Sequence, residues 1–270
     1  MVEVIFINKL QQHEMKMLTE LVDLLNKYDI QYYMIGGSLI GAMRHQGFIP
    51  WDDDIDLGMT RENYDRFLNI IPAQLNANYF LQTDESEEGY ALSYAKLTDI
   101  TTNFPIEADK NAHVRQGIFI DIFPYDVRPV SKLGGLIQYF FYEYYDLFEK
   151  RRLGYGHHDG PKSKMMMVLQ NVTPWVTTDK IKNKRKKWMT KYNNKLTTAS
   201  EFINLSTSYG YADALMKREE LSIMQTQFEQ VEVSVSQRFD DILTREYGDW
   251  RKLPDESEQK STHFQNTEEI

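Results

Sequence analysis

Two aspartates stand two residues apart, as Asp54 and Asp56, in the run WDDDIDLGM that begins at Trp51. Alternate residues of a β-strand share one face, so a strand here would direct both carboxylates to one side and bury Ile55 and Leu57 on the other. Two neighbouring carboxylates repel each other unless a cation lies between them. Because oxygen ligands suit Mg²⁺ or Mn²⁺, the spacing predicts a site for one of these ions.

The acidic run has two other interpretations. A solvated loop is the ordinary one for consecutive aspartates, although the apolar residues on both sides make this a costly setting for such a loop. An EF-hand loop beginning at Asp52 fails, because its sixth position needs Gly and has Leu57, and its twelfth needs Glu and has Asn63.

A second candidate element is Gly36-Gly37-Ser38, between a strand-like run and an expected helix over residues 39–45 with Ser38 as its N-cap. Glycines let the backbone approach a phosphate, and a helix N-terminus presents free N–H groups to an anion. The alternative is a tight strand-to-helix turn. The nearby Asp-x-Asp run favours the phosphate-binding interpretation.

Asp121 is the third candidate, an acid in the middle of the apolar run GIFIDIF at residues 117–123. An ionised carboxylate in an apolar strand costs free energy unless it is paired or bound to a metal. Two interpretations follow. Asp121 has a basic partner in the core, or it is a third metal ligand that also serves as base for an attacking hydroxyl.

Hydrophobic periodicity predicts the elements that must position these residues. Helices are expected over residues 10–28, 39–45, 61–71, 134–153 and 237–247, and strands over 31–35, 79–82, 90–97 and 117–123. We interpret residues 1–270 as one domain. An alternative division separates a catalytic core, residues 1–130, from a mostly helical part, residues 131–270.

The composition excludes several classes of protein. Thirty-one basic against forty acidic residues give a net charge of −9, which argues against a general nucleic-acid binder. The lack of cysteine excludes disulfide scaffolds, cysteine nucleophiles, thiolate zinc sites and iron–sulfur clusters. No apolar run reaches the roughly 20 residues that span a bilayer, and no secretory signal is evident. We therefore expect a cytoplasmic protein.

Residues 32–59, YYMIGGSLIGAMRHQGFIPWDDDIDLGM, resemble the signature of the LicD family. These are phosphorylcholine-type transferases of the nucleotidyltransferase superfamily, related to the fukutin group. GIFIDIFPYD at 117–126 is similar to the family's second acidic strand, and FDDILTREYGDW at 239–250 to its C-terminal end. The chain departs from the family at residues 233–236, where it has VSVS in place of frequent prolines.

The resemblance implies an α/β (α+β) fold, with a nucleotidyltransferase-like core of a short mixed sheet flanked by helices and a helical C-terminal part. The family's catalytic and metal-binding carboxylates carry over to Asp54, Asp56 and Asp121. Its phosphate-binding turn carries over to Gly37 and Ser38.

Further roles follow from the same resemblance. Asp52 and Asp53 would orient the acidic loop. Arg44 and His45 would reach a phosphate or the leaving group, with capping of a helix C-terminus as the alternative. Lys96 is a candidate phosphate contact.

The implied activity is Mg²⁺-dependent transfer of phosphocholine, or a similar phospho-alcohol, from CDP-choline or another CDP-alcohol. The acceptor would be a hydroxyl of a cell-surface glycan precursor, such as teichoic acid, capsule or lipopolysaccharide, and CMP would leave. Two alternatives stay open. One is a true nucleotidyltransferase that adds NMP to a sugar or small molecule, and the other is an inactive regulator that binds nucleotide or glycan.

A lipid-linked acceptor would place the protein at the inner face of a membrane. The aromatic stretch at 139–145 and the basic run at 182–191 suit such a peripheral contact. A core helix and a solvated face are the alternatives.

Overall fold

The strand β5 (Phe119–Val127) lies at the centre of the sheet, and every one of its residues is buried. A nearly continuous apolar run is typical of a strand covered on both faces. β5 pairs in parallel with β2 (Asp56–Thr60) on one side. On the other side it pairs antiparallel with β4 (Ala95–Asp99). These three strands carry the acidic site.

The sheet runs in the order β1-β2-β5-β4-β3. β1 (Tyr33–Met34) and β3 (Tyr79–Gln82) form its edges and pair antiparallel with their neighbours. β6 (Glu201–Ile203) continues the sheet from the end of β5, and β7 (Leu215–Lys217) pairs with β6. One parallel pair among antiparallel ones makes this the predicted mixed sheet.

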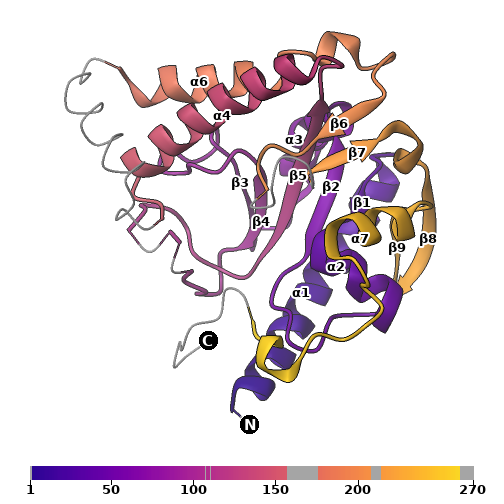
Figure 1. Ribbon diagram of the computed structural model, residues 1–270. Coiled ribbons are helices and arrows are strands. Elements are labelled where there is room, and N and C mark those ends of the chain that lie inside the picture. The colour runs from indigo at the N-terminus through magenta and orange to yellow at the C-terminus, as the bar shows by residue number, and fades with distance from the viewer. Residues whose placement is uncertain (1, 107, 110, 157–175, 208–213, 262–270) are drawn as a thin grey trace.

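The structure is a computed structural model that describes residues 2–106, 108–109, 111–156, 176–207 and 214–261. Helices flank the sheet, as expected (Figure 1). They are α1 (Val2–Lys27), α2 (Gly36–Ile40), α3 (Arg61–Ile70), α4 (Lys132–Arg152), α6 (Thr178–Met189) and α7 (Phe239–Tyr247). In α1, Met17, Leu18, Leu21 and Leu25 form a buried stripe at helical spacing.

The part after residue 130 contains strands in addition to the helices expected there. α4, α6 and α7 confirm helices there, but β6 and β7 join the main sheet, and β8 (Ile223–Phe228) and β9 (Val231–Ser236) form a separate hairpin. β6 and β7 have three residues each, too few for a visible period. The hairpin turns at Glu229, whose φ is +49°, and its VEVSVS strand alternates apolar and polar residues.

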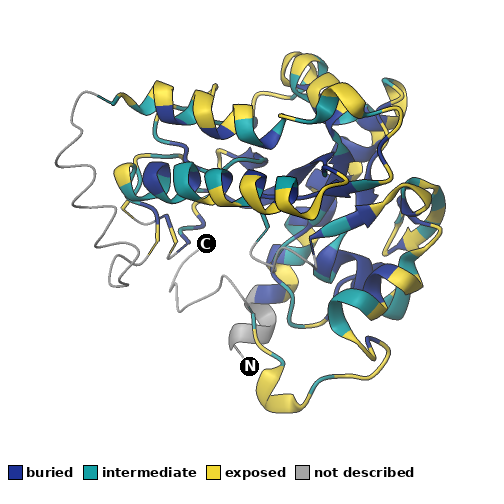
Figure 2. Ribbon diagram, turned by 45° about the horizontal axis from the view of Figure 1, so that its top comes forward, coloured by how far each residue is buried: buried dark blue, intermediate teal, exposed yellow. Residues whose placement is uncertain are grey.

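The sheet crosses residue 130, because β6 pairs with the last residues of β5. Among helices in the described ranges, none is both long and apolar enough to cross a membrane. α4 and α6 lie side by side at one end of the sheet in both ribbon views, with exposed residues along their outer surfaces (Figure 2).

A buried ion pair joins the start of α3 to the end of β5, and we expect its loss to destabilise the fold. Arg61 donates from Nε and Nη2 to the two carboxylate oxygens of Asp126, both at 2.8 Å, and Asp126 is fully buried. Arg61→Met leaves that carboxylate without its charged partner. We expect the free energy of unfolding in urea to fall by about 3–5 kcal/mol.

The exposed pair Arg238–Asp241 provides the matched control, since both side chains are more than half exposed. Arg238→Met should change the free energy of unfolding by less than about 1 kcal/mol. Equal losses in the two variants would contradict the importance of the buried pair.

Candidate active site

Strand register places three of the predicted residues side by side. Asp56 of β2 lies opposite Asp121 of β5, and Asp121 lies opposite Lys96 of β4. Residues directly opposite on neighbouring strands project from the same face of a sheet. A carboxylate, a second carboxylate and an ammonium group therefore form a row across three strands.

Asp54 joins this row from a loop, because β2 begins at Asp56 and not before it. The strand argument for Asp54 and Asp56 is therefore wrong, although the two carboxylates still interact. Desolvation, followed by the charges of Asp54, Asp121 and Asp52, raises the pKa of Asp56 well above its usual range, and Lys96 opposes this rise only weakly. The site thus has more negative charge than its own residues offset.

Lys96 is the basic partner that one interpretation of Asp121 required. Its Nζ lies 3.0 Å from Oδ1 of Asp121 and 3.3 Å from the centre of the Phe119 ring. Both charged side chains are almost fully buried. A role for Lys96 as a phosphate contact stays a prediction, since its ammonium group lies against the carboxylate here.

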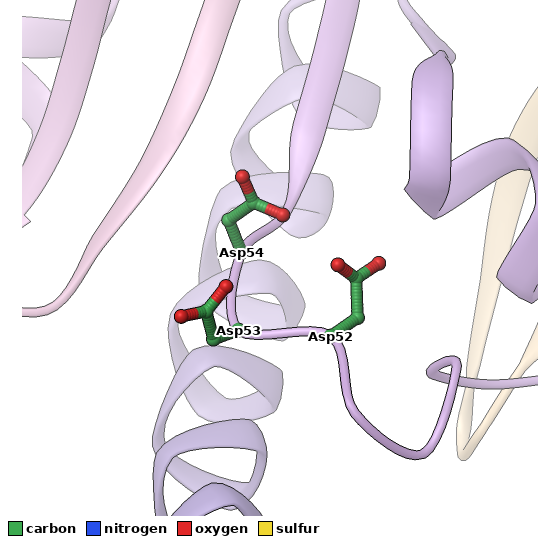
Figure 3. A group of neighbouring side chains, drawn as sticks. All are labelled: Asp52, Asp53 and Asp54. Atoms are coloured by element: carbon green, nitrogen blue, oxygen red, sulfur yellow. The ribbon is translucent and has the colours of Figure 1, made fainter. Parts of the chain in front are cut away.

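The loop before β2 gathers a further set of carboxylates. In the described part of the chain, Asp52, Asp53 and Asp54 have carboxylate oxygens within 4.8 Å of one another. Figure 3 shows the three side chains leaving one short loop. Asp53 is fully buried and accepts a hydrogen bond from the Ser261 hydroxyl. This group shares Asp54 with the predicted metal ligands.

Glu14 of α1 is a member of the site that the sequence analysis missed. It is 1% exposed, and its Oε2 has no hydrogen-bond partner among the described residues. Desolvation and then the charges of Asp54, Asp53, Asp52 and Asp56 raise its pKa well above the ordinary value. The available signal was an acid on the apolar stripe of α1, three residues before Met17.

Comparison with known proteins decides the family of this chain. It is 30% identical over 251 residues, 90% of each chain, to the lipopolysaccharide cholinephosphotransferase LicD of Haemophilus influenzae. The model of the LicD/FKTN/FKRP nucleotidyltransferase domain matches residues 29–151. The chain belongs to the LicD family.

Two further relatives cover shorter stretches of this LicD-family chain. An uncharacterized protein of Rickettsia typhi is 34% identical over 119 residues, 44% of this chain and 36% of that protein. Ribitol 5-phosphate transferase FKRP of Mus musculus is 29% identical over 104 residues, 38% of this chain and 18% of that protein.

The glycine turn of this LicD-family chain is built differently from the prediction. Gly36 has φ +57° and α2 begins there, so Ile35 is the N-cap and Ser38 lies inside the helix. The buried Ser38 Oγ accepts a hydrogen bond from the Asp56 N–H at 2.9 Å. Ser38 therefore ties α2 to the first residue of β2, while phosphate binding by Gly37 and Ser38 stays a prediction.

Arg44 and His45 lie at the end of the π-helix η1 (Gly41–His45), and Arg44 contacts the C-terminal segment. Arg44 Nη1 donates to the carbonyls of Trp250 at 2.6 Å and Lys252 at 3.3 Å. Its Nε lies 3.0 Å from His45 Nε2. Desolvation lowers the pKa of Arg44, and desolvation with the Arg44 charge lowers that of His45. Their predicted phosphate contacts are untested.

Tyr94 is a second residue that the sequence analysis did not single out. Its hydroxyl is hydrogen-bonded to Asp121, and burial with the charges of Asp121 and Asp56 raises its pKa well above 10.0. Its ring packs on Phe123, with the ring centres 4.2 Å apart. Tyr94 and Lys96 thus hold Asp121 from two directions.

The donor set fits a divalent cation such as Mg²⁺ or Mn²⁺. It consists of carboxylate oxygens, which these hard cations prefer. The charges of Asp54, Asp121 and Asp52 contribute to the raised pKa of Asp56, and a cation would offset this crowding of carboxylates. Asp54, Asp56 and Asp121 remain the predicted ligands.

The site yields a prediction for Glu14. Its folded pKa is raised above the ordinary 4.5, so the folded protein retains a proton that the unfolded chain loses above that pH. The stability that Glu14 contributes is present below about pH 4.5 and is lost as the pH rises through the folded value. Glu14→Gln cannot lose this proton. We expect its free energy of unfolding, measured in EDTA, to fall less than that of the wild type between about pH 5 and pH 8.

The exposed acid Asp23 on the same helix supplies a control, Asp23→Asn, which should follow the wild-type pH dependence. A Glu14→Gln curve parallel to the wild type would mean that Glu14 titrates normally and is not part of the cluster.

A second prediction concerns Gly37. A Cβ at this position would lie 2.8 Å from Asp52 Oδ2, so Gly37→Ala must displace that carboxylate. Displacing a side chain next to metal ligands typically costs ten- to a hundredfold in metal affinity. We expect calorimetric titration to show about a tenfold weaker affinity for Mn²⁺ in this variant.

Gly134→Ala is the matched helical control, because a Cβ there meets its nearest atoms at an ordinary 3.5 Å. It should bind Mn²⁺ as the wild type does. Unchanged affinity in Gly37→Ala would separate Asp52 from the cation site.

Proposed function

We propose that this protein transfers phosphocholine, or a similar phospho-alcohol, from a CDP-linked donor to a hydroxyl of a cell-surface glycan precursor. The observation that carries the proposal is the row of Asp56, Asp121 and Lys96 across three strands, with Asp54 beside it. Two relatives support the reaction class, since one is named a cholinephosphotransferase and the other a ribitol 5-phosphate transferase. Both names describe transfer of a phosphorylated alcohol.

Asp54, Asp56 and Asp121 are the residues that would hold Mg²⁺. When bound, the cation would neutralise the donor phosphates and lower the pKa of the acceptor hydroxyl. The protein's own task is then to position the reactants in line, because phosphoryl-type transfer needs positioning and charge stabilisation more than covalent help. The buried ends of β2 and β5 supply a rigid frame for this.

The bonds change at the phosphorus that carries the alcohol. The acceptor oxygen forms a bond to this phosphorus, and the bond to the bridging oxygen of CMP breaks, so that CMP leaves with that oxygen. The hydroxyl proton passes to a carboxylate, for which Asp121 is our candidate. Lys96 and Tyr94 keep Asp121 in a fixed orientation for that role.

Phosphocholine is the donor group that we favour. A hollow lies between η1 and the C-terminal segment. Its lining includes the aromatic residues Trp51, Tyr247 and Trp250, the acids Asp249, Asp255 and Glu258, and the cations Arg44 and Lys252. Aromatic faces and carboxylates both attract a quaternary ammonium group. Glycerol or ribitol would instead require hydrogen-bonding groups.

The activity is tested by CMP release with Mg²⁺, comparing CDP-choline, CDP-glycerol, CDP-ribitol and CTP, each with and without a glycan acceptor. We expect CMP from CDP-choline. Asp56→Asn should lower the rate of CMP release at least a hundredfold. The substitution removes a negative charge that would hold the cation, and the transition state would lose the stabilisation that the cation supplies.

Asp23→Asn is again the matched control and should retain the wild-type rate. Pyrophosphate released from CTP, with no CMP from any CDP-alcohol, would favour the nucleotidyltransferase instead. Nucleotide binding without turnover in the presence of acceptors would favour the inactive regulator. Wild-type turnover by Asp56→Asn would exclude the proposed mechanism.

A further inference from the structure

The outer face of α4 exposes a row of large apolar side chains. Seven large hydrophobic residues are exposed in the described part of the chain, and five of them lie within residues 130–140. They are Val130, Leu133, Leu136, Ile137 and Phe140, with exposed fractions of 91, 67, 56, 39 and 63%. Leu133, Leu136, Ile137 and Phe140 follow helical spacing, so they form one stripe along α4. Contiguous apolar surface of this kind marks an interaction site.

The neighbouring helix α6 presents lysines beside this stripe. Lys184 and Lys187 lie at helical spacing on one side of α6, and Lys191 follows just after the helix ends at Met189. All three are exposed, and none has a carboxylate within 4 Å in the described ranges. The opposite side of α6 is occupied differently. There, Lys182 donates to two carbonyls of the loop before β4, and Lys186 pairs with Glu85.

An aromatic stack joins the apolar stripe to the lysines. Phe141 of α4 and Trp188 of α6 stack with ring centres 4.3 Å apart and planes 11° apart. Lys191 Nζ lies 3.8 Å from the centre of the Trp188 ring. The two helices α4 and α6 lie side by side in both ribbon views (Figure 2). The stack links α4, which carries the apolar stripe, to the segment that carries the lysines. We call these residues the α4–α6 surface.

The α4–α6 surface is held rigidly on the body of the protein. The fully buried Arg185 of α6 lies 3.2 Å from Asp146 and 3.1 Å from Glu149 of α4. Opening the helix pair would break these buried contacts between α4 and α6. The apolar stripe is therefore not a core face that became exposed by separation of the two helices.

The inner face of α4 reaches the candidate active site. Tyr142 is buried, and its hydroxyl is 2.8 Å from Ser93 Oγ. The next residue, Tyr94, is hydrogen-bonded to Asp121. One helix thus carries the exposed stripe on one side and contacts the segment of the reactive carboxylates on the other.

We propose that the α4–α6 surface docks on a bilayer that contains anionic phospholipid. Apolar side chains at an interface, with tryptophan and lysines beside them, are the composition that suits the headgroup region. The net charge of −9 repels such a bilayer overall, so the local lysines must supply the attraction. The purpose of this membrane docking rests on the proposed function, because a lipid-linked acceptor would be delivered at the α4–α6 surface.

The test is flotation of the full chain with vesicles of phosphatidylcholine alone or with phosphatidylglycerol. We expect binding to the anionic vesicles that weakens as salt is raised. A triple variant in which Lys184, Lys187 and Lys191 are all replaced by Gln should bind these vesicles about a hundredfold more weakly. Each lysine near an anionic surface contributes about fivefold to the affinity. Leu136→Gln with Phe140→Gln should lower it at least about tenfold. Leu136 and Phe140 of α4 and Lys184 and Lys187 of α6 are exposed on helices, where Gln is well tolerated. Lys191 is exposed just after α6.

Two control variants match these changes. Replacing Lys9, Lys16 and Lys27 of α1 with Gln makes the same charge change on exposed lysines elsewhere, and Ile100→Gln removes an exposed apolar residue elsewhere. Both should bind vesicles as the wild type does. Equal losses in the α6 and α1 lysine variants, or no binding of the wild type to anionic vesicles, would overturn the proposal.

Two further measurements distinguish membrane docking from the proposed function and from self-association. Asp56→Asn should bind vesicles normally while losing transfer activity, so docking and the proposed function can fail independently. Sedimentation velocity of the wild type and of the Leu136→Gln, Phe140→Gln variant checks for a second copy on the same face. A wild-type dimer that the variant converts to monomer would assign the face to self-association and overturn membrane docking.

Discussion

Mutual repulsion among buried carboxylates is the constraint around which the site is arranged. Asp56 and Glu14 both have pKa values raised by burial and by the surrounding aspartates. The fold holds these groups together by contacts that do not involve their charges. Gln11 of α1 donates to the carbonyls of Ile49 at 3.2 Å and Asp52 at 2.9 Å, and Ser38 accepts from the backbone of Asp56. The surrounding core thus supports an electrostatically unfavourable arrangement, which is what a cation site would require.

Local patterns in the sequence were sufficient to predict most of the elements that carry the candidate active site. Strand β3 has the bounds expected for it, and the acid within the apolar β5 was recognised because a charge there requires a partner. The contribution of Glu14 was not predicted, because it depends on how α1 packs against a loop forty residues away. Ser38 was predicted to cap a helix, but its hydroxyl accepts a hydrogen bond from a distant strand. The local sequence does not distinguish these two roles, because the second depends on tertiary packing. That these carboxylates bind a cation, and which of them do so, are still predictions.

The two interpretations of Asp121 turn out to be compatible. The buried partner exists, since Lys96 contacts Asp121, yet the same carboxylate lies opposite Asp56 across the parallel pair. Burial and then the charges of Asp54 and Asp121 still raise the pKa of Asp56, although the charge of Lys96 lowers it. An ion pair that would be sufficient for a structural acid is therefore insufficient here, which favours a site that also binds a cation.

The position of α4 explains why a charge of −9 need not keep this chain from an anionic surface. Electrostatic fields act on approach and orient a molecule whose charge is unevenly distributed. An anionic bilayer would repel most of the protein surface and attract the lysines of the α4–α6 surface. This surface would therefore reach the bilayer first. Tyr142 on the inner side of α4 contacts Ser93, next to the Tyr94 that holds Asp121. The charge distribution would thus orient the protein with α4 against the bilayer. In this orientation, α4 alone would separate the bilayer from the segment that supports the reactive carboxylates.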